Sequence, residues 1–143
     1  KKAIIYPSFY LSEYLESHRD EYYKALLDIS QNDNWEGWIA FFLQAVIEQS
    51  RKNITKAKEI MKLYEQKKER VSELTKSQYS IKIIDTLFMM PIFKSNVFIR
   101  ISRIPQASAM RYIRILEQNN VISSDQKERY KTYFFNKLLK IVA

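Results

Sequence analysis

The scarcity of glycine and proline constrains the fold of this chain more than any other feature. Among 143 residues there is 1 glycine, Gly37, and there are 3 prolines, Pro7, Pro91 and Pro105. Glycine supplies the positive φ angles that many tight turns need, and proline interrupts helices. A chain with so few of either is poorly suited to a many-turned sandwich or barrel. The sequence therefore predicts a mainly α-helical fold, and a hydrophobic fraction of 46% is enough for packed cores.

Helical periodicity dominates the first part of the chain. Apolar residues at helical spacing predict a helix from Ser8 or Ser12 to about Ile29, in which residues 17 and 18 mark a candidate break. The polar segment QNDN follows as a connection. Its last residue, Asn34, is expected to cap the next helix, because asparagine accepts hydrogen bonds from the free N–H groups of a first helical turn.

The segment after this connection changes character along its length. Residues 35–49 are apolar on more than one face, which is typical of a helix buried on both sides or lacking a partner. Gly37 inside it predicts close packing against another backbone. From Arg51 a long, exposed helix is expected, whose narrow seam allows a coiled-coil or hairpin partner as one alternative. The seam residues are Ile54, Ala57, Met61, Tyr64, Val71 and Leu74.

The remaining residues, 79–143, predict a winged helix that forms a domain separate from residues 1–78. A helix over Tyr79 to Met89 ends before Pro91, and a second helix is capped by Ser95. The turn at residues 102–105 leads into a third helix, which has Pro105 at its first position and runs to Gln118. The later elements are a strand starting at Val121-Ile122, a polar turn over Asp125–Arg129, a strand over Tyr130–Phe135 and a helix over Asn136–Val142.

The third helix predicted in this domain is the best candidate for a nucleic-acid contact. Ala109, Ile113 and Leu116 share a face that can pack on a core, while the opposite face is polar and cationic. Such a helix can enter a DNA major groove, where arginine and glutamine reach base edges or phosphates. The candidate DNA-binding residues are Arg103, Gln106, Ser108, Met110, Arg111 and Arg114 in the helix-turn-helix and Lys127, Arg129 and Lys131 in the wing.

Charge is concentrated in the same half of the chain. Of the formal net charge of +8, residues 79–143 contribute +7, from 11 Lys and Arg against 4 Asp and Glu. A basic half is the electrostatic footprint of a polyanion-binding domain. Three alternatives stay open at this point: a basic surface kept for solubility, a winged helix that contacts protein, and wing lysines that are only solvated.

Other classes of protein are disfavoured by what the sequence lacks. It contains no cysteine and a single histidine, His18, so neither a disulfide framework nor a thiolate metal site can form. A reducing compartment such as the bacterial cytoplasm fits this composition. No apolar run approaches the roughly 20 residues of a membrane span, so no membrane partner is expected. The chain begins at Lys1 without methionine, which suggests an excised fragment.

The N-terminal half resembles the C-terminal part of Fic-family proteins. In that family a segment of the form YLSxYxxxxRxxYYxxL precedes WxxWIxFFLxxV, and the resemblance extends from about Tyr6 to Tyr64. Many Fic proteins also carry a winged helix after the long helix, with the pattern SxxTAxRxIxxLxxxGII, which residues 105–122 match loosely. The matching residues of the first half are Tyr10, Leu11, Ser12, Tyr14, Arg19, Tyr22, Tyr23, Leu26, Trp35, Trp38, Ile39, Phe41, Phe42, Leu43 and Val46.

The resemblance implies that a full-length parent is an enzyme. Fic enzymes are protein adenylyltransferases that transfer AMP to a protein hydroxyl through an HPFxDGNGR loop, so ATP and Mg²⁺ are the cofactors expected of the parent. This chain lacks that loop, so the fragment itself is expected to hold no cofactor and to be catalytically inactive. The resemblance therefore implies a helical segment of the Fic core followed by a winged helix that binds DNA or regulates the enzyme. The alternative is a dimerisation module that positions protein substrates.

Two positions depart from the glycines usual in such a helix-turn-helix. Arg103 stands in the tight turn and Asn120 precedes the wing strand. Asparagine tolerates the left-handed backbone conformation well, so Asn120 is expected to serve. Arginine tolerates it less well, and a different kind of turn is therefore expected at Arg103.

Overall fold

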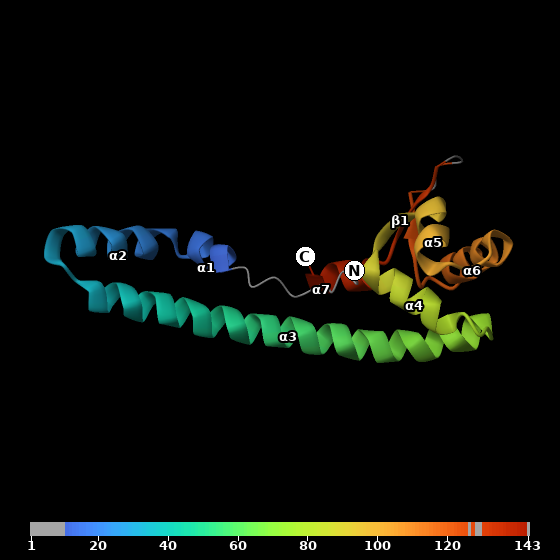
Figure 1. Cartoon of the computed structure of the whole chain (residues 1–143), viewed down its shortest axis with the longest axis horizontal. Helices are drawn as coiled ribbons and strands as arrows, with labels where there is room; N and C mark the ends of the chain where they lie inside the picture. The colour runs from blue at the N-terminus through green and yellow to red at the C-terminus, as the bar shows by residue number, and fades with distance from the viewer. Residues whose placement is uncertain (1–10, 126, 128–129, 143) are drawn as a thin grey trace. The chain divides into compact units, whose positions relative to one another are not determined.

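The computed structural model describes residues 11–125, 127 and 130–142, and these form a mainly helical chain with a small antiparallel sheet (Figure 1). This confirms the mainly α class. The helices are α1 (Leu11–Ser17), α2 (Arg19–Asn32), α3 (Trp35–Thr75), α4 (Ser80–Met89), α5 (Ser95–Ser102), α6 (Gln106–Gln118) and α7 (Asn136–Val142), and the strands are β1 (Ile92–Lys94), β2 (Ser123–Ser124) and β3 (Thr132–Phe134).

The chain divides into two compact units, Lys1–Ala57 and Lys58–Ala143. The division falls inside α3, so the first part of this helix belongs to one unit and the second part to the other. The sequence predicts a boundary between residues 78 and 79. That position lies in the connection between α3 and α4, C-terminal to the division between the two units. The difference arises because the last turns of α3 pack with the elements that follow them, as Leu63 and Val71 show.

The first unit is a set of helices joined by aromatic contacts. The break expected at residues 17 and 18 is confirmed, since α1 ends at Ser17 and His18 precedes α2. The Tyr14 ring lies 6.2 Å from that of Phe41, and the Tyr22 ring lies 5.7 Å from that of Trp38. Aromatic pairs at these separations are favourable beyond the area they bury.

The junction between α2 and α3 is organised by one asparagine. Asn34 Oδ1 accepts a hydrogen bond from the Gly37 backbone N–H at 2.9 Å, which confirms Asn34 as the cap. The prediction that Gly37 packs against another backbone is wrong. A Cβ at this position would instead lie 2.7 Å from Asn34 Nδ2, so the glycine makes room for the capping side chain.

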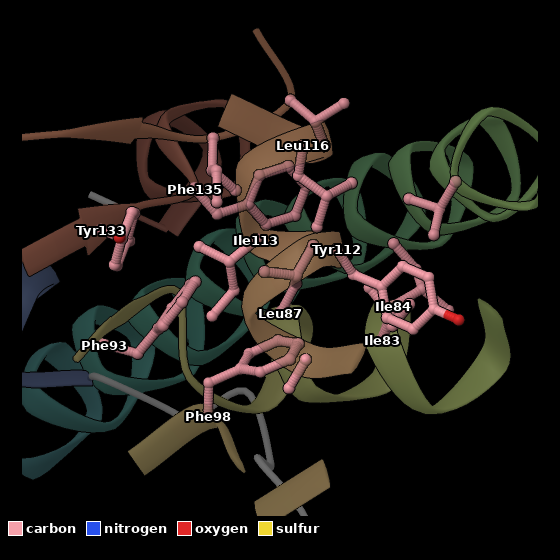
Figure 2. Packing of buried hydrophobic residues seen from close by; sticks show 14 of the residues in the cluster. Ile83, Ile84, Leu87, Phe93, Phe98, Tyr112, Ile113, Leu116, Tyr133 and Phe135 are labelled. Carbon is pink, nitrogen blue, oxygen red and sulfur yellow. The ribbon is translucent and has the colours of Figure 1, made fainter. Parts of the chain in front are cut away.

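The second unit has the larger hydrophobic core. Ile83, Ile84 and Leu87 of α4 are fully buried together with Phe98 of α5 and Phe135, which follows β3 (Figure 2). The core face expected for α6 is confirmed, because Ala109, Ile113 and Leu116 are each no more than 1% exposed. Full burial of an isoleucine, leucine or phenylalanine side chain stabilises a fold by about 1.5–3 kcal/mol.

The sheet contains one strand that the sequence did not predict. Its order is β1-β3-β2, and β3 pairs antiparallel with both neighbours. The prediction that a strand begins at Val121-Ile122 is wrong by two residues, because β2 begins at Ser123. The Val121 and Ile122 side chains are 4% and 3% exposed and belong to the core. The strand expected over Tyr130–Phe135 is shorter, whereas the helix expected over Asn136–Val142 is confirmed.

Two helix starts differ by one residue from the sequence prediction. Ser95 is the first residue of α5 rather than its cap, and the capping position is held by Lys94 without a side-chain hydrogen bond. Pro105 is the cap of α6 rather than its first residue, because its ψ of 137° is extended. The Pro105 carbonyl nevertheless accepts the first helical hydrogen bond, from the Ala109 N–H at 2.9 Å.

Over residues 11–125, 127 and 130–142, no helix combines the length and the apolar character that a bilayer crossing requires.

Candidate nucleic-acid interface

The turn between α5 and α6 takes the left-handed conformation that glycine usually supplies. Arg103 has φ 54° and ψ 35°, and its N–H donates to the Ile99 carbonyl at 3.1 Å. The prediction of a different turn is therefore wrong: the chain keeps this geometry in spite of the arginine Cβ. Ser102 Oγ lies 3.4 Å from the Ile104 N–H, which donates to it, and Ile104 is buried beneath the turn. These contacts hold α5 and α6 in place.

A groove of about 720 Å³ lies between α6, the start of α5 and the β2–β3 hairpin. We call it the cationic groove, because Lys94, Arg114 and Lys131 approach it from three different elements. The structure thus brings together Met110, Arg114 and Lys131 among the residues expected to bind DNA. The full lining is Lys94, Ser95, Asn96, Met110, Ile113, Arg114, Glu117, Tyr130, Lys131 and Tyr133.

Arg111 lies outside this groove, although it is on the same helix as Arg114. Its guanidinium donates to Tyr112 Oη at 3.2 Å and stacks over the Tyr112 ring, with Cζ 5.1 Å from the centroid. Tyr112 Oη in turn donates to Ser77 Oγ at 2.8 Å. The pKa of the Tyr112 hydroxyl is lowered, because its deprotonated form can accept hydrogen bonds from the Ser77 hydroxyl and, with a smaller effect, from the Arg111 guanidinium. Arg111 is thus engaged at the junction of α3 and α4.

Three further candidates are placed around α6 but do not line the cationic groove. Gln106, in the first turn of α6, and Arg103, in the turn before it, are both exposed. Ser108 is half-buried. In helix-turn-helix proteins that bind DNA, exposed groups at the start of the second helix of the motif contact base edges. None of the three lines the groove.

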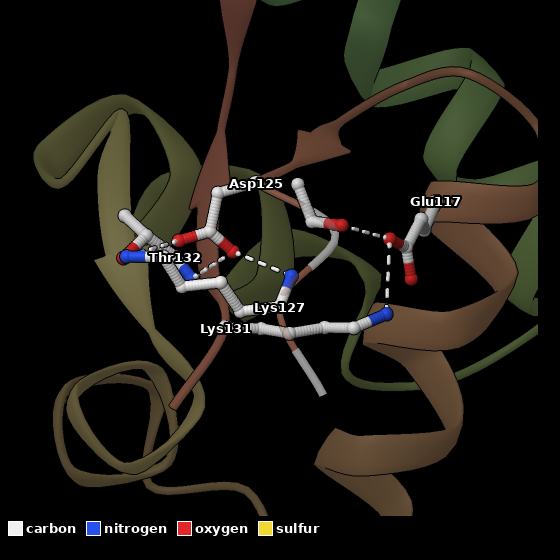
Figure 3. A network of polar contacts seen from close by, with 6 residues as sticks. Glu117, Asp125, Lys127, Lys131 and Thr132 are labelled. Carbon is white, nitrogen blue, oxygen red and sulfur yellow. Dashed lines mark hydrogen bonds and ion pairs between the residues drawn. The ribbon is translucent and has the colours of Figure 1, made fainter. Parts of the chain in front are cut away.

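The β2–β3 hairpin is organised by a carboxylate at its turn. Asp125 Oδ1 accepts hydrogen bonds from the backbone N–H groups of Thr132 at 3.2 Å and Lys127 at 3.4 Å (Figure 3). Burial alone would raise the pKa of the Asp125 carboxyl, but these hydrogen bonds and the Lys127 charge lower it. The Lys127 ammonium pairs with the same carboxylate at 3.8 Å. Arg129 lies outside the described residues.

Lys131 is also paired with a carboxylate of its own chain. Its Nζ lies 3.8 Å from Glu117 Oε1, and the same oxygen accepts a hydrogen bond from Ser124 Oγ at 2.5 Å (Figure 3). Glu117 therefore joins α6 to both sides of the β2–β3 hairpin. Lys127 and Lys131, the two lysines described between β2 and β3, are consequently neutralised in part by nearby acidic groups.

Lys94 and Tyr130 are among the groove residues that the sequence did not indicate. Lys94 pairs with Thr132 in the register of β1 and β3. The strand β1 has three residues, which is too short for a local sequence pattern to predict it. Tyr130 is 85% exposed, with φ 57°. The sequence places Tyr130 in an expected strand, where alternation of side chains predicts that a tyrosine packs on the sheet. The exposed position of Tyr130 before β3 could not be predicted from that alternation.

No protein-family model matches the sequence. Among the residues that the structure describes, no group of three or more His, Cys, Asp or Glu side chains is arranged to hold a metal ion. The geometry of the cationic groove is therefore the main guide to function.

Proposed function

We propose that residues 79–143 form a winged helix-turn-helix domain that binds duplex DNA through α6 and the cationic groove. The order of elements supports this assignment: three helices interrupted by a short strand, then a hairpin whose inner strand pairs with that first strand. In such domains the third helix lies in the major groove, and the hairpin forms a wing beside it.

The single observation that carries the proposal is the convergence of Lys94, Arg114 and Lys131 on one groove beside the exposed face of α6. Lys94 and Arg114 come from separate elements and are suited to neighbouring phosphates of one backbone strand, because phosphate contacts set register and dominate affinity. The excess of +7 over residues 79–143 adds long-range attraction for a polyanion.

Arg114 and Arg111 offer a matched pair for testing the proposal. Fluorescence anisotropy with labelled duplexes, from about 50 to 200 mM salt, gives affinity and the number of phosphates neutralised. Arg114→Ala is expected to weaken binding to duplexes of every sequence and to reduce the salt slope by about 1, because this side chain lines the groove and is proposed to contact phosphate. Arg111→Ala is expected to cost less, because Arg111 is engaged with Tyr112. Absence of binding at low salt, or equal losses in the two variants, would contradict DNA binding through this groove.

The domain is proposed to belong to a Fic-family protein. The resemblance over Tyr6 to Tyr64 supports this parentage. Residues 1–78, which include α1, α2 and the long helix α3, are then the C-terminal helices of a Fic core. The AMP transfer expected of that family is assigned to a full-length parent using ATP and Mg²⁺. It is not assigned to these 143 residues, which contain no HPFxDGNGR loop.

A specific observation favours a second candidate, an interaction module without DNA binding. In the first unit, α3 exposes large apolar side chains: Trp35 is 55%, Leu43 55% and Ile47 45% exposed. Exposed apolar patches are typical of protein–protein interfaces. This candidate predicts a concentration-dependent dimer in sedimentation, together with no salt-linked affinity for duplex DNA. The same anisotropy series therefore separates the two candidates.

A further inference from the structure

Glu117 is a carboxylate in the wall of a groove whose other charged groups are cationic. Among the described residues that line the groove, Lys94, Arg114 and Lys131 are positive and Glu117 alone is negative. A carboxylate at this place repels phosphate, since like charges a few ångströms apart are unfavourable even near solvent. Its presence requires a role other than attraction of the DNA backbone.

The contacts of Glu117 indicate what that role is. Oε1 lies 3.8 Å from Lys131 Nζ and accepts the 2.5 Å hydrogen bond from Ser124 Oγ. The Lys131 and Glu117 side chains are 37% and 29% exposed, so the pair sits at the groove surface and not in the core. The lysine that a phosphate would need at this end of the groove is thus already held by an internal anion.

We propose that Glu117 is a specificity-determining residue that restrains non-specific phosphate binding by holding Lys131. This inference rests on the proposed function. Phosphate contacts in the groove then come from Lys94 and Arg114, while Lys131 stays paired with Glu117. The net effect is a lower electrostatic affinity for every duplex, so that base contacts from α6 account for a larger share of binding.

The central experiment compares Glu117→Gln with a charge-matched control. Glu73→Gln also removes one negative charge from an ion pair, with Arg70 at 3.5 Å on α3, but Glu73 does not line the groove. In Glu117→Gln the released Lys131 can neutralise one more phosphate. Relative to Glu73→Gln, the slope of log affinity against log salt should therefore steepen by about 0.9 for duplexes of random sequence. Affinity should rise roughly two- to fivefold, the range of an exposed ion pair.

Two further variants test whether the release of Lys131 causes the steeper salt slope. Glu117→Gln combined with Lys131→Gln should return the salt slope to that of the wild type, because the released cation is gone. Ser124→Ala keeps the carboxylate and the Lys131 pair while removing the 2.5 Å hydrogen bond, so it should leave the slope unchanged. Circular dichroism melts of each variant show that the domain remains folded.

The outcomes separate this inference from the proposed function. If the salt slope of Glu117→Gln were unchanged and its binding equal or weaker, the proposal that Glu117 restrains phosphate binding would be overturned. The role of Glu117 would then be to stabilise the β2–β3 hairpin against α6. If the wild type binds no duplex at low salt but Glu117→Gln does, the restraint is supported and DNA binding by the native domain is not. If neither binds, both are overturned.

Discussion

Arg103 holds a backbone position that most side chains disfavour. Its φ of 54° places Cβ close to the following carbonyl, at a cost of about 1–2 kcal/mol for residues that have a Cβ. Glycine avoids this cost, although it loses about 0.5–1 kcal/mol more conformational entropy on folding. We expect Arg103→Gly to raise the free energy of unfolding of the second unit by about 0.5–1 kcal/mol, measured by urea denaturation.

Arg103→Ala is the control for this substitution. Alanine keeps the Cβ and removes only the exposed guanidinium, so its free energy of unfolding should stay within about 0.5 kcal/mol of the wild type. If Arg103→Ala raised the free energy of unfolding as much as Arg103→Gly, the arginine charge, and not the backbone strain, would be what limits stability.

Residue type predicts left-handed positions only in part. Asn120 was expected to adopt this conformation and does so, with φ 54°, because its short polar side chain tolerates it. Lys76 and Tyr130 have φ values of 43° and 57°. The chemistry of lysine and tyrosine does not favour those values, so residue type alone does not predict these two positions.

At the scale of single elements, the start of α3 depends on a contact between Asn34 and Gly37. Asn34 Nδ2 donates to Asp28 Oδ2 at 2.5 Å while Oδ1 caps the helix, so the side chain is held at both ends. A new Cβ at Gly37 cannot easily displace it. We expect Gly37→Ala to weaken the first turn of α3 by about 1 kcal/mol, the value of a lost cap.

The Asn34→Ala background supplies the control. There the capping side chain is absent, so Gly37→Ala should instead stabilise the turn, by up to about 1 kcal/mol from helix propensity. Hydrogen exchange at the backbone amides of residues 37–40 measures both changes. The same sign for Gly37→Ala in the two backgrounds would show that the steric contact with Asn34 is unimportant.

Helices were predictable here because their signals are local. The stripe of Ala109, Ile113 and Leu116 identified the buried face of α6 from its own sequence. The strand β1 could not be predicted in this way, because it is defined by pairing with β3, about 40 residues later in the chain. Its absence from the prediction also hid Lys94.

The candidate site was predictable to a similar extent. The helical period places Arg114 on the outer face of α6, and the structure puts it in the groove. The same period places Arg111 on that face, yet its guanidinium turns to Tyr112, a partner that helical spacing does not reveal. Likewise, the pairing of Lys131 with Glu117 joins the β2–β3 hairpin to α6, between residues 14 positions apart. Contacts of this kind follow from tertiary structure alone.

For the molecule as a whole, stability at alkaline pH depends on a contact between α3 and α4. Tyr64 Oη donates to Asp85 Oδ1 at 2.7 Å. This hydrogen bond, with a smaller contribution from burial, raises the pKa of Tyr64 from its ordinary value of 10.0 to about 12. A raised pKa in the folded state means that the contribution of Tyr64 to stability is fully present below pH 10.0 and is lost as the pH rises to about 12.

Thermal melts of the wild type and Tyr64→Phe test this dependence. The difference in Tm between the two proteins should be constant from neutral pH to about pH 9 and should shrink above pH 10. Deprotonation of lysines at high pH affects both proteins equally, so the difference isolates the tyrosine. A gap in Tm that is independent of pH would rule out the link between Tyr64 ionisation and folding.

Met110 gives the cationic groove a chemical property that its charges do not. Its side chain is 37% exposed in the groove wall, and the chain has no cysteine to react with oxidants in its place. Peroxide converts a thioether into a sulfoxide, which is polar, and reductases can reverse the change. The surface proposed to meet DNA thus contains a group whose polarity depends on the oxidant around it, at constant net charge.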